Sequence, residues 1–109
     1  MGVSSQQVLS TTGTASSPWL NVAAFTTMSV YVQGLEVGGS VAVWMSNWQQ
    51  RPDTLVRGNP ADTGAKFLSI ATTGNSISQI NCPAVWMQFV KTAAGAAVPT
   101  TVCIAGSMY

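Results

Sequence analysis

The feature that most constrains this chain is its short runs of alternating apolar and polar residues. Residues 27–33 and 40–46 place apolar side chains at every second position, which is the period of a half-buried β-strand. Gly, Pro, Asn and Ser separate such runs, and no segment of ten or more residues has helical spacing. The pattern predicts an all-β protein.

The whole chain of 109 residues has the size of one domain. It contains about eight short strands at intervals of roughly 8 to 12 residues, as antiparallel sandwiches do. We predict a single antiparallel β-sandwich over residues 19–109, jelly-roll-like in topology and without a long helix. Residues 1–18 are rich in Ser, Thr and Gln, and they form either an N-terminal arm or a first edge strand.

Two hairpins are predicted from the alternation. Residues 27–33 and 40–46 flank a Gly-rich turn at residues 34–39, where several positions tolerate a positive φ. Residues 85–91 and 98–105 flank an Ala-rich turn, and one pairing register aligns the apolar positions of both runs.

That register places Val85 opposite Ile104 and Met87 opposite Val102. It puts Cys82 and Cys103 about 13 Å apart along the hairpin, which is too far for a disulfide. The first residues show no signal peptide, so both thiols are expected to be reduced. We expect both cysteines to pack as small core side chains.

Charge is scarce on this chain. Charged residues make up 6% of the sequence and the net charge is +1, whereas about 25% is usual for a globular domain. The few Lys and Arg residues are not clustered as nucleic-acid binding requires, and no apolar run approaches the roughly 18 residues of a membrane-spanning helix. We therefore expect neither a nucleic acid nor a membrane as a partner. A nearly uncharged surface favours association, so the chain is expected to function while bound in an assembly.

The residues that most enzymes need are missing. The sequence has no His, which excludes Ser-His and Cys-His nucleophiles, and two Cys cannot complete a structural zinc site. Asp53 and Asp62 share a loop and could form a carboxylate pair, but pairing with Arg51 and Arg57 or simple solvation explains them better. We predict no catalytic activity, no cofactor and no metal.

Partner binding is predicted mainly for the long irregular stretch at residues 47–62, which holds four of the seven charged residues. Trp48 lies there beside Arg51, and Trp with Arg is a typical pair at interface hot spots. Trp44 and Trp86 fall within strands and are expected in the core. The candidate partner-binding residues are Val8, Leu9, Trp19, Trp48, Gln49, Arg51 and Arg57.

Residues 41–47 (Val-Ala-Val-Trp-Met-Ser-Asn) and 84–92 (Ala-Val-Trp-Met-Gln-Phe-Val-Lys-Thr) resemble strands of phage virion sandwich proteins. As a short, charge-poor sandwich without catalytic residues, the chain resembles the decoration, or cement, proteins of tailed-bacteriophage capsids. The resemblance implies a major capsid protein as partner and a homo-oligomer, dimer or trimer. It also implies assembly in the host cytoplasm and a place on the capsid exterior, stapling neighbouring capsomers.

The tryptophans leave a second function open, that of a carbohydrate-binding or tail-fibre β-sandwich module. Trp48 or Trp19 would stack on sugar rings, while Asn47, Gln49 and Gln50 would form hydrogen bonds. The shortage of carboxylates, which commonly bind sugar hydroxyl groups, counts against this alternative.

Overall fold

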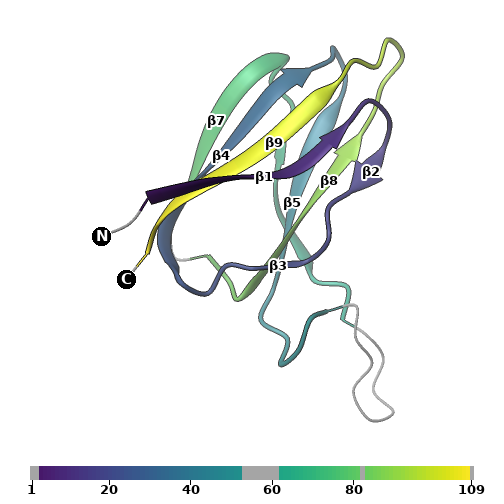
Figure 1. The fold of residues 1–109 in the computed structure, drawn as a ribbon. Coiled ribbons are helices and arrows are strands. Elements are labelled where there is room, and N and C mark those ends of the chain that lie inside the picture. Colours follow the sequence, from purple (N-terminus) through teal and green to yellow (C-terminus); the bar gives the residue numbers. More distant parts are fainter. Residues whose placement is uncertain (1–2, 53–61, 82, 109) are drawn as a thin grey trace.

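The computed structural model describes residues 3–52, 62–81 and 83–108 (Figure 1). This part of the chain is all β and contains no helix, as expected. It therefore has no helix that could span a membrane. The nine strands are β1 (Val3–Thr11), β2 (Ala15–Ser16), β3 (Leu20–Asn21), β4 (Phe25–Leu35), β5 (Ser40–Ser46), β6 (Ala65–Ile70), β7 (Gly74–Asn81), β8 (Trp86–Thr92) and β9 (Thr100–Met108).

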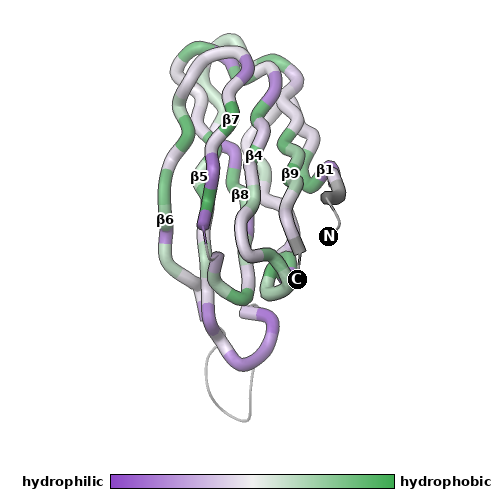
Figure 2. The backbone as a smooth tube through the Cα atoms, turned by 90° about the vertical axis from the view of Figure 1, so that its left-hand side faces the viewer, coloured by the Kyte–Doolittle hydropathy of each residue, from purple (hydrophilic) through white to green (hydrophobic). Residues whose placement is uncertain are grey.

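The strands form two antiparallel sheets packed face to face. Sheet A has the order β1-β9-β4-β7, and sheet B has the order β2-β8-β5-β6, with β3 also paired to β8. Six of the eight connections between these strands cross from one sheet to the other, as in a jelly-roll-like sandwich, while β2–β3 and β5–β6 stay within sheet B. Figure 2 shows the layers from the side, with β5 and β6 at the left and β9 and β1 at the right. The predicted antiparallel sandwich is confirmed.

Both predicted hairpins are wrong. β4 and β5 belong to different sheets, and so do β8 and β9. Ile104 pairs with Val30 instead of Val85, and Met87 pairs with Met45 instead of Val102. Alternation shows which side chains point inward, but two inward-facing strands can meet either side by side or across the core. In this sandwich they meet across the core.

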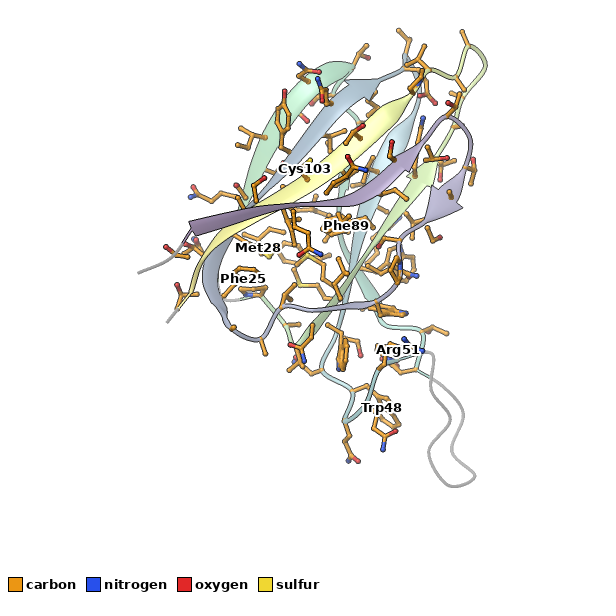
Figure 3. All side chains as sticks on the ribbon, viewed as in Figure 1. Phe25, Met28, Trp48, Arg51, Phe89 and Cys103 are labelled. Atoms are coloured by element: carbon orange, nitrogen blue, oxygen red, sulfur yellow. The ribbon has the colours of Figure 1, made fainter. Side chains whose placement is uncertain are left out.

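The alternation predicts which positions point into the core. The expectation that Trp44 and Trp86 lie in the core is wrong, because both alternate with inward-facing residues of sheet B, point outward and are half-buried. The buried side chains come from every second position of the long strands, and Met28 and Phe89 lie between the two sheets (Figure 3). The described core cluster consists of Val22, Met28, Val30, Val32, Leu35, Val41, Val43, Ile70, Ile80, Met87, Phe89, Val102 and Ile104.

The beginning of the chain contributes edge strands. β1 pairs with β9 from Val3 opposite Ser107 to Thr11 opposite Thr100, with a bulge at Val8. The short β2 pairs with β8 in the other sheet. The backbone hydrogen bonds of these segments are therefore made within the protein.

Cys103 departs from the expected core position. Its neighbours Val102 and Ile104 point into the core, so Cys103 faces outward from sheet A, where it is half-buried and carries a free thiol. The distance argument against a disulfide fails with the hairpin on which it was based. Cys82 lies outside the described residues.

Candidate interaction surfaces

The end of β5 builds the surroundings of Trp48. The Ser46 hydroxyl accepts a hydrogen bond from the Trp48 backbone N–H at 3.0 Å and donates one to the Asp62 carboxylate. Asn47 Oδ1 accepts the backbone N–H of Val85 at 3.1 Å, which joins this corner to the segment before β8. Because these bonds link residues before and after the β5–β6 connection, they hold Trp48 and Asp62 at the same end of the sandwich.

A hollow of about 500 Å³ opens at this end, which we call the Trp48 hollow. Trp48 is half-buried, and its indole Nε1 is buried without a hydrogen-bond partner in the structure. The hollow is lined by Met45, Ser46, Asn47, Trp48, Asp62, Gly64, Ala65 and Ala84. Its size falls within the range of small-molecule sites.

Trp19 packs behind this hollow instead of on the surface. Only 8% of the residue is exposed, and a Cβ at Gly64 would lie 2.7 Å from Trp19 Cη2. Gly64 also has a φ of +71°, which favours glycine. Trp19 therefore supports the wall of the Trp48 hollow, and a partner cannot reach its face directly.

The remaining predicted site residues divide between two regions. Gln49 and Arg51 are exposed, and Figure 3 shows Trp48 and Arg51 together at the lower end of the molecule. Val8 and Leu9 lie on β1 in sheet A, half-buried against the core. Arg57 and Asp53 fall outside the described residues. The structure thus gathers Trp48, Gln49 and Arg51 but separates them from Val8 and Leu9.

The outer face of sheet A is a second surface. No Asp, Glu, Lys or Arg occurs in any of its four strands as the structure describes them. A shallow hollow of about 170 Å³ lies over Ser29, Ala105 and their neighbours. The outward residues with described side chains are Ser5, Gln7, Ser10, Thr27, Ser29, Tyr31, Gln33, Asn75, Ile77, Gln79, Asn81, Thr101, Cys103, Ala105 and Ser107.

The sequence does not single out this face. Each of its strands shows only an ordinary alternation of polar and apolar residues, and the shared lack of charge becomes visible once the four strands are placed in one sheet. The scarcity of charge along the whole chain is the only sequence signal for it.

The opposite end of the sandwich contains a buried ion pair. Lys91 Nζ lies 2.9 Å from Glu36 Oε1, and both side chains are buried. Glu36 Oε2 also accepts the Ala94 backbone N–H at 2.9 Å. The hydrogen bond from Lys91, followed by that from Ala94, lowers the pKa of Glu36 from 4.5 to about 2, although burial opposes the shift.

Three further oxygens lie within hydrogen-bonding distance of the Lys91 ammonium. Nζ donates to Thr100 Oγ1 at 2.7 Å and to the carbonyls of Thr12 and Val98 at 3.1 Å each. The ammonium therefore joins the β1–β2 connection to the start of β9. These contacts indicate a structural role for Lys91. In the described ranges, no group of three His, Cys, Asp or Glu residues could hold a metal ion.

Comparisons with protein-family models, with curated proteins and with solved structures find no match to this chain. The resemblance of residues 41–47 and 84–92 to phage virion proteins therefore stays a prediction. The functional proposals below rest on the fold and on the two surfaces.

Proposed function

We propose that this chain is a non-enzymatic structural protein of a tailed-bacteriophage virion. It is a decoration protein that binds the major capsid protein on the capsid exterior and stabilises the shell. It acts as a homo-oligomer, a dimer or a trimer, after assembly in the host cytoplasm. It needs no cofactor, nucleic acid or membrane.

The uncharged outer face of sheet A is the observation that carries this proposal. The centres of protein interfaces are depleted of charged residues, because a charge taken out of water without a partner is costly. A broad sheet face of Ser, Thr, Asn and Gln with Tyr31 and Ile77 can be buried without that cost. Jelly rolls are also a common architecture of viral capsid proteins.

The described charges lie away from this face. Glu36 and Lys91 neutralise each other inside the sandwich. Arg51 and Asp62 belong to the end that holds Trp48, and Lys66 is on β6 of sheet B. Sheet A therefore presents an uncharged surface to a partner. The described charged residues lie elsewhere, where they are in contact with solvent or paired.

Co-sedimentation with shells of a major capsid protein, sought among the reading frames that neighbour the gene for this chain, tests the proposal. The variant Ser29→Lys places a charge near the centre of the outer face of sheet A. The matched control Ser69→Lys makes the same change on β6, where Ser69 is exposed on sheet B. We expect wild type and Ser69→Lys to bind and to raise the temperature at which shells disrupt.

Ser29→Lys should lower shell occupancy at least tenfold, since burying one unpaired charge costs more than about 1.4 kcal/mol. Circular dichroism melting of the free variant checks that the fold is intact. Equal binding by Ser29→Lys and wild type would rule out sheet A as the docking face. No binding by wild type would remove the decoration function.

Carbohydrate binding is a second candidate, and the Trp48 hollow is the observation that favours it. A half-buried indole, the Asn47 amide and the Asp62 carboxylate meet in a hollow of about 500 Å³. Asp62 supplies a carboxylate acceptor for sugar hydroxyl groups, which partly answers the shortage of carboxylates in the sequence.

A glycan array with the isolated protein tests this second candidate. Binding by wild type that is lost in both Trp48→Ala and Asp62→Asn, each with a cooperative melting transition, would support it. The absence of any glycan bound by wild type would exclude it.

A further inference from the structure

The free edge of β7 is unlike the other edges of the two sheets. β4 is its only strand partner among the described elements, so one side of its backbone offers unpaired N–H and C=O groups. Proteins normally protect such edges with charges, prolines, bulges or very short strands, because an open edge pairs readily with another strand.

Each of the other edges carries such protection. β1 is bulged at Val8. β6 contains Lys66 and shows a register shift in its pairing with β5. β2 and β3, which share the remaining edge, are two residues long each.

β7 carries none of these features in its described residues. Ser76–Asn81 pairs with β4 without a register shift, and Gly74–Asn81 contains no charged residue and no proline. Ile77 on this strand is 69% exposed. A regular, uncharged edge with an exposed aliphatic side chain is a ready template for strand addition.

We propose that β7 pairs antiparallel with β7 of a second copy of this chain, about a twofold axis at Ser78. The sheets A of both copies then join into one continuous eight-stranded sheet. Ser78 is the centre of residues 75–81, so an axis there pairs this whole stretch, with outward residues opposite outward residues. Ile77 of each copy lies opposite Gln79 of the other, and a shift by one residue would mix the two faces.

The lack of charge favours a second copy as the occupant. Under a twofold axis a strand meets itself, so any charged residue on it would face a like charge nearby, which is destabilising. β7 is free of this repulsion, whereas β6 with Lys66 is not. This inference specifies the homo-oligomer of the proposed function as a dimer, and it holds whether or not the chain binds a capsid.

Sedimentation velocity of the purified protein tests the dimer. An edge contact of this length is smaller than a standard interface, so we expect a reversible dimer whose share rises with protein concentration. The double variant Ile77→Lys/Gln79→Lys places like charges opposite each other across the axis and should sediment as a monomer. The matched control Ser5→Lys/Gln7→Lys alters exposed residues of β1, at the far edge of the same sheet, and should remain dimeric.

Three results would overturn the proposal. They are a wild-type monomer at all concentrations, an edge variant that still dimerises, and a control variant that is monomeric although folded. A control variant that is monomeric although folded would indicate that the dimer forms by face-to-face contact of the two sheets A. A wild-type monomer would indicate that the β7 edge pairs with a strand of another protein.

Oxidative cross-linking tests the register in a Cys82→Ser/Cys103→Ser background. Ile77→Cys and Gln79→Cys should each fail to cross-link alone and should form a disulfide-linked dimer when mixed. Cross-linking of Ile77→Cys with itself would move the axis away from Ser78 and contradict the register.

Discussion

Lys91 and Glu36 join one end of the sandwich through charge rather than through apolar packing. A buried ion pair is destabilised strongly when one partner is removed, since the other charge is left without compensation. Both groups also have further hydrogen-bond partners, which are Thr100 and the carbonyls of Thr12 and Val98 for Lys91 and the Ala94 backbone N–H for Glu36. The pair therefore fixes how the β4–β5 turn meets the β8–β9 connection.

Acid should weaken this end of the fold. The pKa of Glu36 is about 2 when folded, against 4.5 ordinarily, so its contribution to stability is complete above pH 4.5 and is lost as the pH falls from 4.5 towards 2. Thermal unfolding midpoints across this pH range should drop for wild type. Glu36→Gln should start from a lower midpoint and show a flatter profile. A Glu36→Gln profile parallel to wild type would contradict this assignment.

Gly106 provides a second prediction for a single residue. A Cβ at this inward position of β9 would collide with the ring of Phe25. Gly106→Ala should therefore destabilise the protein by about 1–3 kcal/mol, the usual cost of overpacking, as measured by urea unfolding. Gly95→Ala is the matched control, since no atom lies within 4 Å of its added Cβ. Equal stability of the two variants would show that Phe25 moves aside freely.

At the scale of elements, alternation predicted the strands and their inner faces but not their partners. The period of two marks Val30, Val43 and Phe89 as inward-facing. Among the described strands, β5 and β6 are the one consecutive pair that is hydrogen-bonded together, because most other connections cross between sheets. The same period also places Lys91 inward with Met87 and Phe89. Its partner Glu36 could not be predicted, because the meeting of their two loops depends on the topology.

The candidate site was likewise predictable only where it depends on residues close together in the sequence. Trp48, Gln49 and Arg51 are adjacent in sequence, so their grouping was predictable. The inward packing of Trp19 on Gly64 and the uncharged face of sheet A are contacts between distant segments, which a local pattern does not encode.

Removal of residues 1–11 tests the role of β1 as an element. The deletion exposes the edge of β9 and uncovers the core beside Val8 and Leu9. We expect loss of cooperative thermal unfolding and aggregation on size-exclusion chromatography, since an exposed edge invites pairing with other chains. Removal of residues 1–2 serves as the control. A truncated protein that elutes and melts as wild type would show that β1 contributes little to the fold.

At the scale of the whole molecule, charge is distributed unequally between the two layers. Sheet A contains no charged residue in its described strands, whereas sheet B contains Lys66 on its edge strand and the buried Lys91. An asymmetry of this kind suits a protein with one face against a partner and the other towards solvent. The proposed β7 pairing would double the uncharged face without interrupting it.

Electron cryomicroscopy of shells decorated with this protein shows which surface docks. We expect the outer face of sheet A, centred on Ser29 and Tyr31, to lie against the major capsid protein, with sheet B towards solvent. Density that places the Trp48 end against the shell and leaves the outer face of sheet A uncovered would contradict this expectation.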